Sequence, residues 1–434
     1  MADQSNKPSI RFAGFTGPWE QRKFSNEFVF LRNNTLSRAR LSGDKGSTLD
    51  VHYGDVLIKF GAILDCRKAD LPYIADDTVA DSLTCDGLED GDIIIADTAE
   101  DLTAGKCSEL RNSSCKRIFA GLHTMPCRPL RQYASGFLGH YLNAPSFHDR
   151  LVPLMQGIKV ISISRSAMEN ARLMVPLLEE QARISNILTR LDDLITLHQR
   201  KYDKLVVFKK AMLEQMFPQE GETVPKIRFA GFTDPWEQRK LGDIADLLTG
   251  FPFESKYFAK EGIPLIRGMN VKRGYLDMTS DICEHWRSAQ GVEPYLLKIG
   301  DIVIQMDGAL IGSSYAMLLP KNVPSLLVQR VARVRCDGQA EYVFQVLQRG
   351  FLPYIKGLKT ETAVPHLSLS DIAEYVIPTP REQKEQQAIG SFFSRLDDLI
   401  TLHQRKQLAM DLGWSALLDW LNHGILHRRK HMSA

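Results

Sequence analysis

The chain has 434 residues, of which 44% are hydrophobic and 24% are charged, and its net charge is only +2. This is the composition of a globular protein with enough chain for two or three domains, and it excludes a uniformly basic protein, so any basic surface must be local. No run of 18 apolar residues, no apolar leader and no C-x-x-C pair among the seven cysteines is present, so we expect a cytoplasmic protein with reduced thiols and no membrane span.

The first predicted element is an opening segment at residues 10–23, IRFAGFTGPWEQRK, which returns at residues 227–240 as IRFAGFTDPWEQRK. The two copies differ only at Gly17 and Asp234. A second repeat, RLDDLITLHQRK, occupies residues 190–201 and 395–406 without any difference. A period of about 200 residues is far too long for a solenoid, so the chain consists of two head-to-tail copies of one unit.

Each copy divides into a variable domain followed by a long helix. The expected segments are a first variable domain at 1–175, a first long helix at 176–217, a second variable domain at 218–377, and a second long helix with a divergent tail at 378–434. Short β-branched runs predict strands at residues 56–60, 93–96, 302–305 and 328–334, and long helical periodicity is scarce in both variable domains. We therefore expect an α/β (α+β) fold with mixed sheets in each variable domain.

The first long helix should start after Pro176, with Glu179 and Glu180 at the positive end of its dipole, and end at Pro218. Its seam positions step by four and three residues: Ile184, Leu188, Leu191, Ile195, His198, Tyr202, Leu205, Lys209, Met212 and Met216. This spacing is that of a coiled coil.

The second long helix should open with a capping box, with Thr379 as the N-cap, Pro380 as the first helical residue and Glu382 as the third. Its seam follows the same steps: Ile389, Phe393, Leu396, Ile400, His403, Gln407, Met410, Trp414, Leu417 and Leu421. Two such helices in one chain predict an antiparallel coiled-coil pair in a pseudo-two-fold arrangement. The alternative is that each helix packs only on its own domain.

Neither copy contains a catalytic motif. Residues 43–48 have the wrong order for a G-x-x-x-x-G-K-[ST] loop, and neither H-E-x-x-H nor G-x-S-x-G occurs. No glycine-rich dinucleotide loop follows a predicted strand. We therefore predict no catalytic residue and no metal site, and we expect the chain to act by binding.

Long helices with a repeated segment, joined to different domains, suit double-stranded DNA, because a rod of fixed length would hold two readers at a fixed distance along the duplex. Such a protein specifies two different half-sites separated by a constant gap. Together, the opening segments and the stretches RNNTLSRAR, KVISIS, TAVPHLSLSDIAEYVIPTP and TPREQKEQQAIGSFFSRLDDLITLHQRK resemble the specificity (S) subunit of type I restriction–modification enzymes, over nearly the whole chain.

The resemblance implies a non-catalytic subunit with two target-recognition domains, which binds two methyltransferase (M) subunits and, in the full enzyme, two restriction (R) subunits. S-adenosylmethionine, ATP and Mg²⁺ would be bound by those partners, so no cofactor is expected in this chain. After Lys406 the sequence no longer repeats the first copy, and Gly413 would cost a helix about 1 kcal/mol relative to alanine. This departure falls where the second partner would dock.

Phosphate contacts provide affinity and base-edge contacts provide specificity, so polar residues in loops are the candidate DNA contacts. In the first domain these are Arg32, Asn33, Asn34, Thr35, Arg38, Arg40, Lys159, Ser162 and Ser164. In the second domain they are Arg267, Asn270, Lys272, Arg273, Lys356, Lys359, Thr360 and His366. For each set the alternative is an ordinary charged loop.

The aromatic residues of the opening segments, Phe15, Trp19, Phe232 and Trp236, are candidates for partner binding, with packing against the adjacent helix as the alternative. Two other functions stay open at this point. One is a protein adaptor without DNA binding, which the low net charge favours. The other is a nuclease with an unrecognised active site.

Overall fold

The computed structural model describes residues 11–113, 116–358 and 366–422, and the side chains only as far as Met410 in the last helix. The chain forms two compact units. The first comprises residues up to His198 together with the segment that begins at Lys406, and the second comprises Gln199–Arg405. The second unit is therefore inserted in the sequence of the first.

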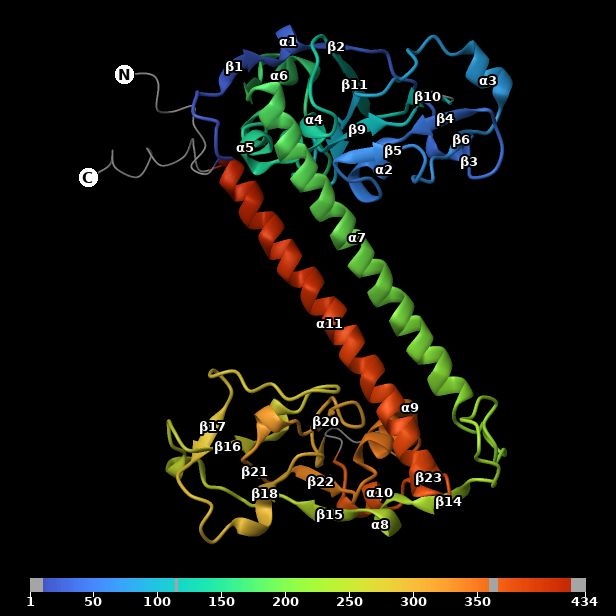
Figure 1. The fold of residues 1–434 in the computed structure, drawn as a ribbon, viewed down its shortest axis with the longest axis vertical. Helices are drawn as coiled ribbons and strands as arrows, with labels where there is room; N and C mark the ends of the chain where they lie inside the picture. The colour runs from blue at the N-terminus through green and yellow to red at the C-terminus, as the bar shows by residue number, and fades with distance from the viewer. Residues whose placement is uncertain (1–10, 114–115, 359–365, 423–434) are drawn as a thin grey trace, which may run out of the picture. The chain divides into compact units, whose positions relative to one another are not determined.

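The first unit is built around a five-stranded and a four-stranded sheet (Figure 1). The larger sheet has the order β2 (Phe28–Phe30), β11 (Thr124–Pro129), β7 (Ile93–Ala96), β9 (Cys107–Arg111) and β5 (Ile63–Asp65). The smaller has the order β10 (Arg117–Ala120), β4 (Thr48–Val51), β6 (Tyr73–Ile74) and β3 (Leu41–Ser42). Since β5 pairs with β9 and β10 with β4 in parallel while their other pairs are antiparallel, both sheets are mixed, as expected.

Short helices and two strand pairs complete the first unit. The helices are α1 (Phe24–Glu27), α2 (Tyr53–Ile58), α3 (Asp77–Ser82), α4 (Phe137–Asn143), α5 (Pro145–His148) and α6 (Arg165–Asn170). The strand pairs are β8 (Thr98–Ala99) with β12 (Ile161–Ser162), and β1 (Glu20–Lys23) with β13 (Arg172–Val175).

The second unit is built around two four-stranded sheets. One sheet has the order β15 (Asp246–Thr249), β22 (Val331–Arg335), β19 (Ile302–Gln305) and β20 (Tyr315–Met317). The other has the order β17 (Glu284–Trp286), β16 (Ile263–Ile266), β21 (Ser325–Leu327) and β18 (Leu296–Leu297). The remaining elements are the pair β14 (Glu237–Lys240) with β23 (Val376–Thr379), and the helices α8 (Leu241–Ile244), α9 (Ala340–Leu358) and α10 (Leu369–Ala373).

The two long helices are α7 (Leu178–Gln215) and α11 (Gln383–Asn422). All ten predicted seam positions from Ile184 to Met216, and those of α11 as far as Met410, are buried or half-buried, as the spacing predicted. Within the second unit, the end of α7 packs against the start of α11 in the opposite direction, with 6.4 Å between the ring centroids of Phe208 and Phe392 (Figure 1). The predicted pairing of the helices is therefore confirmed. Gly413 lies inside α11, so the helix continues into the divergent tail as far as Asn422.

The opening segments fasten each domain to its own long helix through the same contacts. Strand β1 pairs with β13, and β14 pairs with β23. Arg11 binds the buried Glu180 through two hydrogen bonds of 2.7 and 2.6 Å, and Arg228 binds the buried Glu385 through two of 2.7 and 2.8 Å. These bidentate pairs give the repeated arginine of IRFAGFT a structural role at the start of each helix.

Three predictions about local structure are wrong. Residues 56–60 are not a strand, because the His52 side chain accepts from Gly54 N and caps helix α2. Helix α11 begins at Gln383 instead of Pro380, because Thr379 still pairs with Glu237 in the β14–β23 ladder. The second domain contains a 19-residue helix, α9, despite its internal Pro353.

Candidate nucleic-acid interface

A groove of about 400 Å³ opens in the first unit where β7 ends and β11 begins. It collects three predicted DNA contacts from distant parts of the sequence, Asn33, Ser162 and Ser164. Asn33 lies in the loop that follows β2, and its Nδ2 donates to the Gly121 carbonyl at 3.1 Å. Ser164 is the N-cap of α6, with its hydroxyl accepting from Ala167 N at 3.2 Å.

Two residues that the sequence analysis missed stand in this groove. The Nδ1 atom of His123 lies 3.3 Å from the Asp97 carboxylate, to which the Thr98 hydroxyl donates at 2.7 Å. Arg165 places its guanidinium 4.3 Å from the centre of the Phe30 ring. The groove therefore places hydrogen-bond donors beside one carboxylate acceptor. Side chains of these kinds form hydrogen bonds with the polar edges of bases.

The other predicted contacts of the first domain do not line this groove. Asn34 is buried, and its Nδ2 donates to Asp50 at 2.7 Å and to the Ala120 carbonyl at 2.9 Å, so it shapes the loop. Arg32 pairs with Asp86 at 3.1 Å, and Arg38 pairs with Asp55. Thr35, Arg40 and Lys159 are exposed.

The Asn34 side chain also donates to a carboxylate with a strongly shifted pKa, that of Asp50. Burial raises the pKa of Asp50 to about 6, while the hydrogen bond from Asn34 acts in the opposite direction. The second carboxylate oxygen of Asp50 is buried and accepts no hydrogen bond within the described part of the chain. The loop that carries the predicted contacts is therefore held, through Asn34, by the buried carboxyl group of Asp50.

In the second unit, the predicted contacts are dispersed. Asn270 is fully buried and, like Asn34, serves the loop, since its Nδ2 donates to the Asp277 carbonyl at 3.0 Å. The guanidinium of Arg267 donates to the Ile282 carbonyl at 2.6 Å. Lys272 is half-buried and Lys356 is exposed. Lys359 and Thr360 lie outside the described residues.

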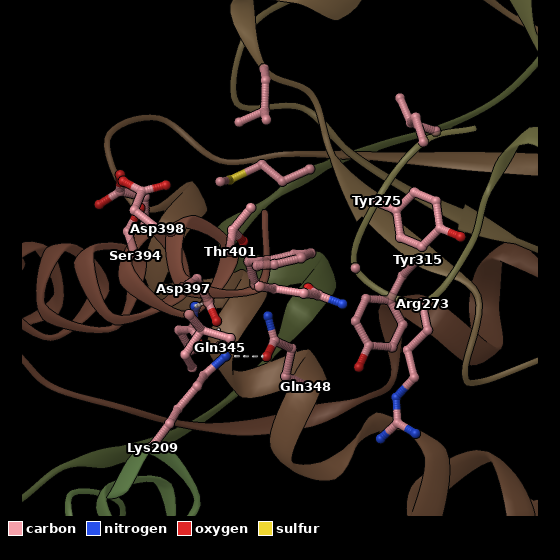
Figure 2. Close-up of a pocket in the computed structure, with 18 of the residues that line it drawn as sticks. Lys209, Arg273, Tyr275, Tyr315, Gln345, Gln348, Ser394, Asp397, Asp398 and Thr401 are labelled. Carbon is pink, nitrogen blue, oxygen red and sulfur yellow. Dashed lines mark hydrogen bonds and ion pairs between the residues drawn. The ribbon is translucent and has the colours of Figure 1, made fainter. Parts of the chain in front are cut away.

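Arg273 lines a cavity of about 740 Å³ between the variable domain and the two long helices within the second unit. Figure 2 shows Arg273, Tyr275 and Tyr315 on one side of the cavity and Lys209, Gln348 and Asp397 on the other. Burial raises the pKa of Tyr315, with Arg273 acting in the opposite direction. Charges of both signs line the cavity, with five basic and three acidic residues.

His366 lies instead at the end of strand β19. Its Nδ1 pairs with the Asp307 carboxylate, whose other oxygen is 3.2 Å from Arg330 Nε. Arg330, which the sequence analysis missed, directly precedes strand β22, as His123 directly precedes β11. In the sequence, the feature shared by both is a polar residue immediately before a strand.

The structure places the four candidate partner-binding aromatics unequally. The indoles of Trp19 and Trp236 are buried in the cores of their units, which favours the packing alternative for these two. Phe15 and Phe232 are half-buried, and the Arg183 guanidinium lies 5.1 Å from the centre of the Phe15 ring.

Two kinds of feature are absent from the part of the chain that the structure describes. Among the described residues, no cluster of three or more histidine, cysteine or acidic side chains could hold a metal ion. None of the described helices combines the length and apolarity needed to cross a bilayer.

Comparison with known proteins gives a consistent result. Residues 72–206 and 233–410 match the type I restriction modification DNA specificity domain. The chain is 24% identical to the MjaVIII specificity subunit of a type I restriction enzyme of Methanocaldococcus jannaschii, over 61% of this chain and 64% of that protein. It is 28% identical to the EcoAI specificity subunit of Escherichia coli, over 38% of this chain and 28% of that protein. The matched region thus spans less than two thirds of either curated relative.

A solved structure shares the fold. The S subunit of a type I restriction–modification system from M. genitalium superimposes with a TM-score of 0.59 at 14% identity, covering 96% of this chain and 98% of that one.

Proposed function

Because the chain belongs to the family of type I restriction modification DNA specificity domains, we propose that it is the sequence-reading subunit of a type I restriction–modification enzyme. This family membership was expected from the repeats, and it is a membership among DNA specificity domains, not among nucleases or methyltransferases. In the proposed role, each variable domain reads one half of an asymmetric bipartite target in double-stranded DNA. The paired helices set the gap between the halves.

One observation carries this proposal. The two units share a pair of antiparallel strands but have different side chains at its end. Strands β7 and β11 of the first unit have the same antiparallel pairing as β19 and β22 of the second. At the end of this pair the first unit presents Asp97 and His123, whereas the second presents Asp307 and Arg330. Equivalent frames with different polar groups favour two different half-sites.

The predicted contacts have separate roles in this proposal. We assign base reading to Asn33, Ser162 and Ser164, which line the groove of the first unit, and to His366 in the second. The exposed residues Arg40, Lys159 and Lys356 suit contacts with the phosphate backbone. The buried Asn34 and Asn270 act by shaping the reading loops.

For the partners, we propose that the repeated dozen residues dock two copies of a methyltransferase subunit. Each copy of the dozen leaves the same two leucines exposed, Leu194 and Leu197 at 43% and 45%, and Leu399 and Leu402 at 43% each. Matched apolar positions on two helices favour two identical partners. Two restriction subunits would complete the enzyme, and S-adenosylmethionine, ATP and Mg²⁺ would act on those partners.

Base-resolved sequencing of adenine methylation tests the function. Cells that contain the methyltransferase partner are compared with and without this chain. A two-part motif with unlike halves and a constant gap, methylated only when the chain is present, is the expected result. If the chain still binds the partner but no methylated motif depends on it, the adaptor function is the better description.

A further inference from the structure

Three residues other than glycine have a left-handed backbone among the described residues: Asn112, His123 and Arg330, with φ of 59°, 56° and 67°. Asparagine and histidine visit this region more readily than most residues, and arginine visits it rarely. Two of the three, His123 and Arg330, are exposed and carry nitrogen donors. A disfavoured conformation persists only where the surrounding structure enforces it, so its place in the fold is informative.

His123 and Arg330 occupy counterpart positions in the two units. His123 precedes Thr124, which pairs with Ala96 across the strands, and Arg330 precedes Val331, which pairs with Gln305. Their carbonyls accept from corresponding amides, those of Asp97 at 3.1 Å and Met306 at 2.9 Å.

The closing segment of each domain completes the same arrangement. Ile163 N donates to the Asp97 carbonyl at 2.8 Å, and Leu367 N donates to the Met306 carbonyl at 2.7 Å. In each unit, three segments that are distant in the sequence therefore meet at the end of the strand pair.

Where these segments meet, His123 and Arg330 each face a carboxylate. His123 Nδ1 lies 3.3 Å from Asp97 Oδ1, and Arg330 Nε lies 3.2 Å from Asp307 Oδ2. The side chains of His123 and Arg330 are 47% and 73% exposed, whereas those of Asp97 and Asp307 are 28% and 23% exposed. Each carboxylate can thus orient its partner while the donor stays accessible to a ligand.

We propose that His123 and Arg330 are counterpart base-reading residues, one in each recognition domain, and that Arg330 with Asp307 reads a G·C pair. A phosphate would be repelled by the carboxylate beside each donor. The edge of a G·C pair instead offers guanine N7 and O6 to an arginine and the cytosine amino group to a carboxylate. This inference rests on the proposed function, and it assigns the reading positions within it.

Glycine substitution separates this role from a structural one. Because glycine adopts a positive φ without penalty, Arg330→Gly and His123→Gly should fold at least as well as the parent, with thermal midpoints that are unchanged or raised. A residue present only for stability would give no other effect. The matched control is Asn112→Gly, which relieves the same backbone conformation away from these positions.

The experiment is adenine-methylation sequencing in cells that carry the methyltransferase partner with the parent chain, Arg330→Gly, His123→Gly or Asn112→Gly. We expect Arg330→Gly to lose discrimination roughly 10- to 100-fold at one G·C position in one half-site, and to leave the other half unchanged. His123→Gly should relax one position in the opposite half, and Asn112→Gly should preserve the whole motif.

Two results overturn the inference while leaving the proposed function intact. One is a parent motif that both glycine variants retain in full. The other is a uniform loss across all sequences together with a weaker salt dependence of DNA binding, because that behaviour identifies phosphate contacts. If the parent chain itself specifies no motif, the proposed function fails, and the inference fails with it.

Discussion

Lys209 on helix α7 and Asp397 on helix α11 are joined by an ion pair with 2.6 Å between Nζ and Oδ1. The same ammonium group donates to Gln348 Oε1 at 2.6 Å, so one lysine ties both long helices of the second unit to helix α9 (Figure 2). Lys209 occupies a seam position that the spacing marked for an apolar residue, and it is buried there. A cation at such a position fixes the register of a helix pair, because only one alignment satisfies it.

Replacing Lys209 by methionine should lower the stability of the second unit by about 1–2 kcal/mol, because the packing of the stem is kept while the two hydrogen bonds are lost. Hydrogen exchange of the α11 amides around Phe393 measures the change locally, which matters in a chain of two units. Lys210→Met is the control, since the neighbouring lysine is exposed. If Lys209→Met and Lys210→Met lowered the protection of these amides equally, Lys209 would not be the residue that fixes the register.

The paired arginines and glutamates make a prediction that can be checked in both halves of the chain. Glu180→Gln and Glu385→Gln should each loosen the opening segment of their own unit, at a cost of about 2–4 kcal/mol, because a half-buried arginine loses the buried carboxylate that it binds. Limited proteolysis within residues 11–19 and 228–236 reports the loosening. Glu179→Gln and Glu382→Gln, on exposed neighbours, should leave both segments protected. If Glu180→Gln exposed residues 228–236, or Glu385→Gln exposed residues 11–19, the assignment of each glutamate to its own opening segment would be wrong.

Asp50 predicts a pH dependence of the first unit. Its pKa is raised from 3.8 to about 6 by burial, so between these values the folded carboxyl holds a proton that the unfolded one has released. Its contribution to the free energy of unfolding therefore falls as pH rises from about 4 to 6, by about 3 kcal/mol at most.

The variant Asp50→Asn should accordingly stabilise the first unit at pH 7–8 and show little gain at pH 4. Protection of the β4 and β10 amides against hydrogen exchange, measured across this range, follows the effect. Asp77→Asn is a useful contrast, because hydrogen bonds from Ser47 lower the pKa of that exposed acid and it should show no gain at neutral pH. A variant difference that does not change with pH would refute the charged state of Asp50 as its cause.

The duplicated leucines predict the stoichiometry of the complex. Leu194→Ala with Leu197→Ala should weaken one methyltransferase site roughly 10- to 100-fold, since about 0.7–1.4 kcal/mol of apolar contact is lost at each half-exposed leucine. Alanine retains the helix because it has the highest helix propensity. Native mass spectrometry should then show one bound copy instead of two. Changing Leu399 and Leu402 as well should remove the second copy, whereas the control Thr196→Ala should retain both.

The sequence was a good guide where structure depends on a local pattern. The four-three spacing identified every buried seam position of α7, because a single face of a long helix meets the core. It failed at residues 56–60, where a β-branched run was overruled by one capping histidine. It failed again at Thr379, where pairing with a strand 142 residues earlier in the chain extended β23 and delayed the helix.

The candidate interface was harder to predict for a related reason. The groove of the first unit joins residues around 33, 97, 123 and 162, and nothing in a linear pattern brings these together. The left-handed conformation of Arg330 is imposed by the return of β22 alongside β19, not by the residue type. Asn34 and Asn270 had the right chemistry for DNA, but burial assigns their amides to the backbone of their own loops.

The insertion of the second unit within the first has a consequence for how the protein is made. Translation delivers Gln199–Arg405 in one uninterrupted stretch, so that unit can complete its core as soon as Arg405 leaves the ribosome. The described core clusters of the first unit lie within residues 19–188, so that unit can pack its core before the second unit is translated. The two domains can therefore fold one after the other in the order of translation, which limits the time that both leave apolar surface exposed.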